Sequence, residues 1–167
     1  MYGWSGMVII LMGVSGSGKT TIGKLLATTL AWPFYDADDF HPQANIEKMA
    51  RGLPLTDADR QPWLDALRTQ IETLIHQGQS GVMTCSALKT SYRDHLASRH
   101  TAAHFVYLHG TYDLIQARLQ ARQDHFMPAD LLASQFAALE EPQDVLRIDI
   151  TATPEAIVQQ IKRALGV

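Results

Sequence analysis

The apolar positions of this chain fall into short runs that alternate with longer stretches of helical spacing. Short apolar runs bounded by polar residues favour buried strands. They lie at Val8–Met12, Val82–Cys85, Phe105–Leu108 and Val145–Ile150, and a briefer strand is predicted at Phe34–Asp36.

Between these runs, apolar residues recur three and four positions apart, which predicts helices with one buried face. Gly78 is placed to end the second helix as a C-terminal cap, and Thr153-Pro154 is placed to begin the last one. The three predicted faces are Ile22, Leu25, Leu26 and Leu30; Leu64, Leu67, Ile71, Leu74 and Ile75; and Ile157, Val158, Ile161 and Leu165.

The alternation of strands and helices predicts an α/β fold, a three-layer sandwich with right-handed crossovers around a central parallel sheet. Ligands of such sheets gather at the carboxyl ends of the strands. A length of 167 residues suits one compact domain. We expect it to span residues 7–167, after a loosely ordered leader at residues 1–6, because no repeat or Pro/Gly/Ser-rich linker divides the chain.

Composition narrows the classes of function. A formal net charge of −3 argues against nonspecific attraction to nucleic acid or to an anionic membrane. The apolar run from Met7 to Val14 is too short to cross a bilayer and lacks the features of a secretory signal. The single cysteine, Cys85, excludes an internal disulfide and favours a reducing compartment, so we expect a cytoplasmic protein.

The segment Gly13–Thr20 reads Gly-Val-Ser-Gly-Ser-Gly-Lys-Thr, the complete G-x-x-x-x-G-K-S/T pattern of a phosphate-binding loop (P-loop). Its glycines let successive backbone N–H groups face one anion, and the following helix adds its positive end. Lys19 is expected to reach the β- and γ-phosphates of a nucleoside triphosphate, and Thr20 to offer a hydroxyl to Mg²⁺. The alternative is a chance glycine-rich turn. The loop residues assigned to the nucleotide are Gly13, Ser15, Gly16, Ser17, Gly18, Lys19, Thr20 and Thr21.

Carboxylates follow the predicted second strand, in the sequence Asp36-Ala-Asp38-Asp39-Phe-His41. Phosphoryl transfer needs a metal to neutralise charge and a group that orients or deprotonates the attacking hydroxyl. Asp36 is assigned to Mg²⁺ through water, and Asp38 to the proton of the acceptor hydroxyl. The alternative is that Asp38 and Asp39 cap the helix after Pro42 or lie solvated in a turn.

The strand predicted at Val82–Cys85 ends without the aspartate that many P-loop proteins place there to hold Mg²⁺. This absence shifts metal binding towards Thr20 and Asp36 and leaves Ser86 and Lys89 to face the phosphate acceptor. Cys85 itself is interpreted as a small buried apolar residue rather than a nucleophile.

Arg118 and Arg122 lie four residues apart in a helical stretch, which puts both on one face. Two guanidinium groups before a short connection suit a lid, around residues 118–128, that clamps the donor phosphates and excludes water. A solvated basic helix face is the alternative.

Together these motifs resemble the gluconokinase family of small P-loop kinases, which is distantly similar to shikimate kinase and adenylate kinase. The resemblance runs from about Met7 to the C-terminus, without a departure in the motif positions. Besides the P-loop it rests on Asp36–Pro42, Asn45, Lys48-Met49, Gly52–Asp57, Asp59–Leu64, Cys85–Lys89, Tyr92–Asp94, His125–Met127 and Ser134-Gln135.

The resemblance implies ATP-dependent phosphorylation of D-gluconate at its 6-hydroxyl, the nucleoside monophosphate kinase fold, and a homodimer. From the distant relatives, Arg118 is assigned to the adenine face, Arg122 to phosphate, and Thr151–Pro154 to the adenine end. Lys19, Asp38 and Arg122 are the expected catalytic residues.

A sugar acid needs cations for its carboxylate and hydrogen-bonding groups along its length. Arg60 or Lys89 is expected to hold the carboxylate, and Lys48 to help by its charge, although surface solubility also explains the lysines. The groups expected to address the hydroxyls are His41, Ser86 and Gln135.

Other functions remain open at this point. A different acceptor, such as shikimate or a nucleoside monophosphate, is an alternative within kinases. A nucleotide-binding switch or a phosphohydrolase is an alternative outside them.

Overall fold

The computed structural model describes residues 6–97, 102–122 and 129–167. A five-stranded parallel sheet with the order β2-β3-β1-β4-β5 forms its centre. The α/β sandwich predicted from the sequence is therefore confirmed. The strands are β1 (Val8–Met12), β2 (Phe34–Asp36), β3 (Gly81–Thr84), β4 (Ala103–His109) and β5 (Leu146–Asp149).

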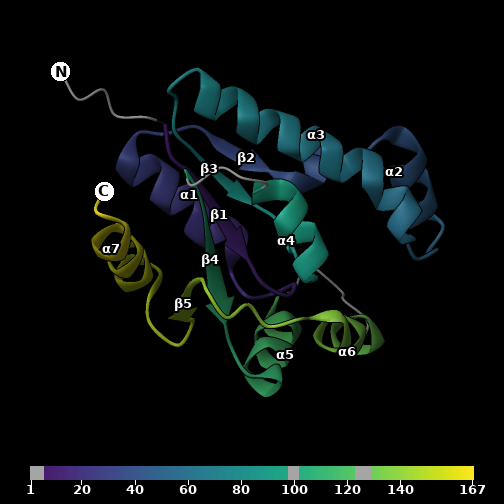
Figure 1. Cartoon of the computed structure of the whole chain (residues 1–167). Coiled ribbons are helices and arrows are strands. Elements are labelled where there is room, and N and C mark those ends of the chain that lie inside the picture. The colour runs from purple at the N-terminus through teal and green to yellow at the C-terminus, as the bar shows by residue number, and fades with distance from the viewer. Residues whose placement is uncertain (1–5, 98–101, 123–128) are drawn as a thin grey trace.

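Helices cover both faces of the sheet (Figure 1). They are α1 (Lys19–Leu30), α2 (Gln43–Ala50), α3 (Asp57–His76), α4 (Thr90–Ala97), α5 (Tyr112–Ala121), α6 (Ala129–Ala138) and α7 (Pro154–Leu165), and a short 3₁₀ helix, η1 (Ala37–Phe40), follows β2. Helices α1 and α7 lie side by side on one face, α3 and α4 lie on the other, and α5 and α6 lie beyond the carboxyl end of β4.

The two faces of β1 show why a continuous apolar run forms the central strand. Ile9 and Leu11 pack with α1 and α7, whereas Val8, Ile10 and Met12 pack with α3, and all five are fully buried. Burial of each such side chain contributes about 1.5–3 kcal/mol, so this strand anchors both layers. The apolar faces predicted for α1, α3 and α7 are buried or partly buried in these two clusters.

The helix ends follow the predicted signals. Gly78 adopts φ 66° directly after the C-cap of α3, a left-handed conformation that favours glycine. Thr153 caps α7 by accepting from the N–H of Ala156, and Pro154 begins the helix. Both predictions are confirmed.

Strand boundaries differ from the prediction by one or two residues. Strand β4 begins at Ala103 rather than Phe105, because Ala103 and His104 pair with Val8 and Ile9 of β1. The sequence did not indicate this start because the polar His104 interrupts the apolar run. Strand β3 ends at Thr84, and Cys85 follows it.

The strand register brings the chemically interesting segments to one edge of the sheet. Asp36 pairs with Thr84, and Thr84 pairs with Leu11, which lies two residues before the P-loop. The N–H of Gly13 donates to the carbonyl of Ser86 over 3.3 Å. The acidic segment, the loop after β3 and the P-loop therefore meet at the carboxyl end of the sheet.

The first described residue, Gly6, is buried, and a Cβ there would lie 1.9 Å from the carbonyl oxygen of Gln79. The division into a leader at residues 1–6 and a domain at residues 7–167 stays a prediction.

Within the described residues, no helix has the length and apolar character needed to cross a membrane.

Candidate active site

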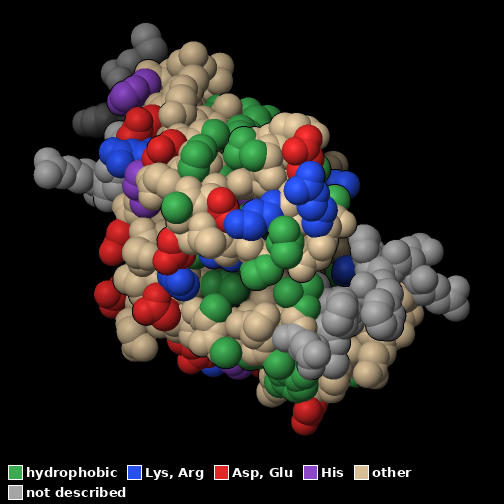
Figure 2. Space-filling view, turned by 90° about the vertical axis from the view of Figure 1, so that its right-hand side faces the viewer, with side chains coloured by type: hydrophobic (Ala, Val, Ile, Leu, Met, Phe, Trp, Pro, Cys, Tyr) green, Lys and Arg blue, Asp and Glu red, His purple; other side chains and the backbone are tan. Residues whose placement is uncertain are grey.

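Two cavities meet at the P-loop. The larger, of about 590 Å³, is here called the transfer pocket, and the smaller, of about 180 Å³, the nucleoside cavity. The face of the molecule that carries α2 and α6 is hollowed, with acidic and basic side chains around the hollow (Figure 2). The transfer pocket is lined by Ser15, Gly16, Gly18, Lys19, Thr20, Asp36, Asp38, Thr84, Ser86, Leu119, Arg122, Leu131 and Gln135. The nucleoside cavity is lined by Gly16, Ser17, Gly18, Thr21, Ile22, Arg118, Arg122, Ile150, Ala152, Pro154 and Ile157.

The P-loop curls tightly between β1 and α1. Gly16 adopts φ 82°, and a Cβ there would lie 2.7 Å from Cγ of Leu119, so conformation and space both require glycine. Gly18 is the N-cap residue of α1, which directs the positive end of that helix at the pocket. The loop therefore has the geometry of an anion cradle.

Lys19 lies folded over this loop. Its ammonium donates to the carbonyls of Gly13 and Val14 over 2.9 and 3.0 Å. Burial lowers the pKa of Lys19 to about 8, although nearby Cys85, Asp38 and Asp36 act in the opposite direction. The residue is half-exposed as a whole, but its ammonium is enclosed, so burial disfavours its charged form.

The acidic segment lies on the other side of the transfer pocket. Asp36 caps η1, since its Oδ1 accepts from the N–H of Asp38 over 2.9 Å. Asp38 reaches into the pocket, where burial and the adjacent charge of Asp36 raise its pKa. A raised pKa makes Asp38 a stronger base than an ordinary aspartate.

The capping alternative for these acids is partly wrong. Pro42 is the N-cap residue of α2, and no side chain caps that helix, so neither Asp38 nor Asp39 does so. Asp36 is the acid that caps a helix, and its second carboxylate oxygen remains available to the pocket.

The loop after β3 carries Ser86 and is held by Arg93. Arg93 is buried and donates to the carbonyls of Ala87, Leu88 and Glu140 and to the hydroxyl of Thr90. Burial raises the pKa of the Cys85 thiol to about 12, consistent with its interpretation as a buried apolar residue rather than a nucleophile. Arg93 thus fixes the backbone that presents Ser86.

The two arginines of α5 lie at the nucleoside cavity. Arg118 donates to the carbonyl of Ile150 over 2.7 Å. Arg122, the C-cap residue of α5, lines both cavities, so the two arginines face the same cavity, as their spacing predicts. Ala152 and Pro154 line the same cavity, at the segment assigned to the adenine end.

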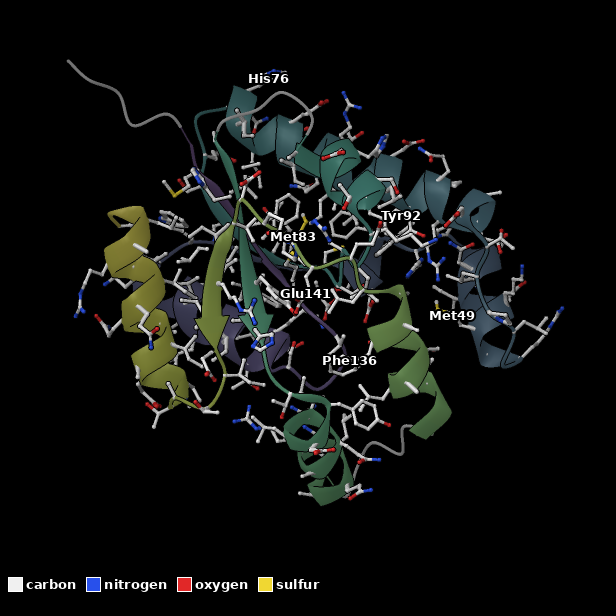
Figure 3. The ribbon with its side chains drawn as sticks, turned by 60° about the horizontal axis from the view of Figure 1, so that its bottom comes forward. Met49, His76, Met83, Tyr92, Phe136 and Glu141 are labelled. Atoms are coloured by element: carbon white, nitrogen blue, oxygen red, sulfur yellow. The ribbon has the colours of Figure 1, made fainter. Side chains whose placement is uncertain are left out.

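The cations expected to meet a substrate carboxylate are paired with aspartates. Lys48 donates to Asp59, and Lys89 lies 3.2 Å from Oδ1 of Asp57. Arg60 lies 3.7 Å from that same oxygen, and the hydroxyl of Tyr92, labelled in Figure 3, donates to it. None of these side chains is among the residues that line the transfer pocket.

His41 also lies outside that lining, next to the acidic segment. Its ring stacks on Trp63 with centroids 4.4 Å apart, and Nδ1 lies 3.3 Å from the amide nitrogen of Asn45. Burial lowers the pKa of His41, an effect that Asp38 opposes and Arg60 reinforces. Trp63 is fixed in turn by its indole N–H, which donates to the carbonyl of Ala37.

Gln135 lines the transfer pocket but contacts the P-loop rather than the groups around Asp38. Its Oε1 accepts from the N–H of Ser15 over 2.7 Å, and its Nε2 donates to Oγ of Ser15 over 2.8 Å. This pairing could not be predicted from the sequence, because the two residues are 120 positions apart.

Several residues that line the two cavities were not predicted from the sequence. Thr84, Leu119 and Leu131 line the transfer pocket, and Ile150 and Ile157 the nucleoside cavity. They belong to runs that read as ordinary core or helix surface, so only the strand register and packing reveal them. The motif His125–Met127 and the lid segment 123–128 lie outside the described residues.

Oxygen donors for a hard cation face the P-loop. Thr20 and Asp36 both line the transfer pocket, and in the parts of the chain that the structure describes no cluster of three or more His, Cys, Asp or Glu residues is arranged to hold a metal ion. A hydroxyl, a carboxylate and phosphate oxygens form a donor set that suits Mg²⁺.

Comparisons with known proteins identify the family of the chain. Residues 15–165 match the protein family described as shikimate kinase. The thermosensitive gluconokinase of Escherichia coli (strain K12) is 47% identical over 165 residues, covering 96% of this chain and 88% of the relative. The gluconokinase of Gluconobacter oxydans (strain 621H) is 44% identical over 158 residues, covering 93% and 89%.

Solved structures show the same fold. A gluconokinase from Sinorhizobium meliloti 1021 superposes with a TM-score of 0.86 at 39% identity, covering 98% of this chain and 93% of that one. An APS kinase from Mycobacterium tuberculosis, solved in complex with AMPPNP and APS, has a TM-score of 0.69 at 18% identity and covers 98% and 99%. The second similarity concerns the fold alone.

Proposed function

The chain belongs to the gluconokinases, within the shikimate kinase family of P-loop kinases, and we propose that it transfers the terminal phosphoryl group of ATP to the 6-hydroxyl of D-gluconate. The products are 6-phospho-D-gluconate and ADP. The observation that carries this proposal is that the anion cradle and the basic carboxylate of Asp38 line one pocket. Donor and acceptor can therefore lie side by side in it.

In this proposal the P-loop amides, Lys19 and Arg122 bind the phosphates of ATP. Lys19 leaves the carbonyls of Gly13 and Val14 and turns its ammonium to the β- and γ-phosphates. The ammonium thereby exchanges two neutral hydrogen-bond acceptors for charged ones. Arg118 and the segment 151–154 bind the nucleoside end in the smaller cavity. Charge develops on the transferred group and the bridging oxygen, where these cations stabilise it.

Asp38 accepts the proton of the attacking hydroxyl as the phosphorus–oxygen bond forms. Partial desolvation and the charge of Asp36 favour its protonated form, so proton transfer to it costs less than to an aspartate without these surroundings. Thr20 and Asp36 would hold Mg²⁺, which supplies charge neutralisation to the phosphates when bound. ATP and Mg²⁺ as cofactors are part of this proposal.

The acceptor's recognition groups surround the pocket. Ser86 lies in its lining, and His41 stands beside Asp38 on the stacked ring of Trp63. Arg60 and Lys89 share Oδ1 of Asp57, an exposed carboxylate that a substrate carboxylate can replace at similar cost. Lys48, tied to Asp59, assists through its charge. A site that pairs the substrate's hydroxyl groups in this way discriminates against analogues that lack them.

The experiment that tests the function measures ADP release with ATP and Mg²⁺, with and without D-gluconate, and with a panel of other sugar acids, shikimate and a nucleoside monophosphate. We expect release to depend on gluconate and to exceed that with shikimate or the monophosphate. If gluconate does not change the rate of ADP release, the protein is a nucleotide switch or a hydrolase. A higher rate with another acceptor overturns the substrate assignment.

Three further features belong to this proposal. We place the protein in the cytoplasm, supported by its single buried cysteine. The homodimer is proposed as what the resemblance to gluconokinases implies. We also propose one kinase domain at residues 7–167 with a short lid around residues 118–128. Light scattering of the purified protein tests the dimer, and a monomeric mass contradicts it.

A further inference from the structure

The carboxamide of Gln135 holds the P-loop at a single residue, Ser15. It accepts from the backbone N–H with Oε1 and donates to the side-chain hydroxyl with Nε2, over 2.7 and 2.8 Å. Because one partner is an N–H donor, a flipped carboxamide would place two donors against each other, so the orientation is fixed by the contacts. Gln135 is half-buried and comes from α6, far from the loop in sequence.

The position of Ser15 along the loop decides what this contact competes with. Ser15 and Gln135 line the transfer pocket together with Asp36 and Asp38, and neither lines the nucleoside cavity. The Ser15 amide therefore lies at the acceptor end of the anion cradle. Amides of such loops bind phosphate oxygens, so this amide faces the last phosphate of a triphosphate, which ADP lacks.

We infer that Gln135 senses the terminal phosphoryl group of ATP and positions it for transfer. This inference rests on the proposed function. When the phosphoryl group arrives, one of its oxygens takes the Ser15 N–H from Oε1, and the Nε2 group turns from Oγ of Ser15 to donate to a phosphoryl oxygen. The N–H of Ser15 and Nε2 of Gln135 each keep a hydrogen-bond acceptor, so the exchange costs little free energy.

The other attachments of helix α6 are independent of the P-loop. Leu132 is buried in the core, and Glu140, just after the helix, contacts Leu88, Thr90 and Arg93. Phe136, next to Gln135, packs edge-on against Tyr112 of α5 with ring centroids 5.3 Å apart (Figure 3). Release of Ser15 therefore leaves α6 joined to α5, the helix that also carries Arg118 and ends before Arg122. Only ATP exchanges the Ser15 contact in this way, whereas ADP leaves the Gln135–Ser15 pair in place.

Two variants separate sensing from simple support of the loop. Gln135→Glu removes the donor and adds a negative charge beside the terminal phosphate, and Gln135→Met removes both hydrogen bonds without adding charge. Gln160→Glu and Gln160→Met on the exposed side of α7 are matched controls. Calorimetry measures the Kd of ADP and of the β,γ-imido analogue of ATP without acceptor, and steady-state kinetics with gluconate measures kcat.

For Gln135→Glu we expect the Kd of the imido analogue to rise about tenfold or more while that of ADP stays within about twofold of wild type. For Gln135→Met we expect kcat to fall by about tenfold. Equal changes for the two nucleotides in the glutamate variant, or an unchanged kcat in the methionine variant, overturn the inference. The nucleotide comparison needs no acceptor, so it decides this point even if gluconate proves not to be the substrate.

Discussion

Lys19 and Asp38 line the same pocket. Burial lowers the pKa of Lys19 and raises that of Asp38, which favours the neutral form of both groups. The ammonium becomes easier to deprotonate, and the carboxylate becomes easier to protonate. The phosphates restore the charge of Lys19, and the acceptor hydroxyl supplies the proton for Asp38. The roles proposed for both residues thus follow from their surroundings as well as from the motifs.

Replacing Asp38 by Asn tests its role as base. We expect kcat to fall by about 10²- to 10³-fold, because an amide cannot take the acceptor's proton. The Kd for ATP stays within about twofold, since the P-loop contacts are untouched. The control is Asp39→Asn, an exposed neighbour outside the pocket lining. Turnover retained in the Asp38 variant removes this residue from the mechanism.

The pKa of about 8 for Lys19 predicts how ATP binding depends on pH. Phosphate groups favour protonated Lys19, so binding is strongest below pH 8 and weakens as the free protein loses this proton. The Kd for ATP without acceptor should rise about tenfold between pH 7 and pH 9. Lys19→Arg, which keeps its charge, should show a flat profile in the same calorimetric series. A constant wild-type Kd over this range contradicts the assignment.

The acceptor's carboxylate is assigned to Arg60 or Lys89, and two variants decide between them. Loss of a charged hydrogen bond should raise the KM for gluconate by about 10- to 100-fold in Arg60→Met or Lys89→Met, with the KM for ATP unchanged. Lys162→Met on α7 serves as the control. An unchanged gluconate KM in both variants places the carboxylate elsewhere.

At the scale of elements, the loop between β3 and α4 is where side-chain hydrogen bonds fix the backbone. Ala87 is buried there with φ 45°, a conformation uncommon for residues other than glycine. Arg93 accounts for its persistence, because it donates to the carbonyls of Ala87 and Leu88 on one side and of Glu140 on the other.

Replacing Arg93 by Met should therefore reduce the free energy of unfolding by about 2–4 kcal/mol, because buried carbonyls lose a charged donor. Urea denaturation measures this change. Arg163→Met, at an exposed position of α7, should alter it by less than about 0.5 kcal/mol. A similarly small effect at Arg93 would mean that other contacts hold the loop.

At the scale of the whole molecule, the parallel sheet determines which segments can meet. Strands β1 and β3 were predictable because they are buried on both faces and read as apolar runs. Their common direction was predictable from the alternating helices, and it places Asp36, Ser86 and the P-loop at one edge. The part of the site built from main-chain geometry could thus be predicted from the sequence.

The partners of individual side chains could not be predicted. Asp57 gathers Arg60, Lys89 and Tyr92, and Gln135 reaches Ser15 from a helix that begins more than a hundred residues later. Such pairings depend on how helices pack on the finished sheet, and local periodicity carries no information about them. The roles of the polar residues around the pocket therefore stay predictions that the variants above test.

A crystal structure of the protein with the imido analogue of ATP, Mg²⁺ and D-gluconate tests the proposed phosphoryl transfer most directly. We expect triphosphate density along the amides of Gly13–Thr20, the nucleoside beside Arg118, and the 6-hydroxyl between Asp38 and the terminal phosphorus. Triphosphate density away from these amides, or a gluconate bound with its 6-hydroxyl turned away from Asp38, would contradict it.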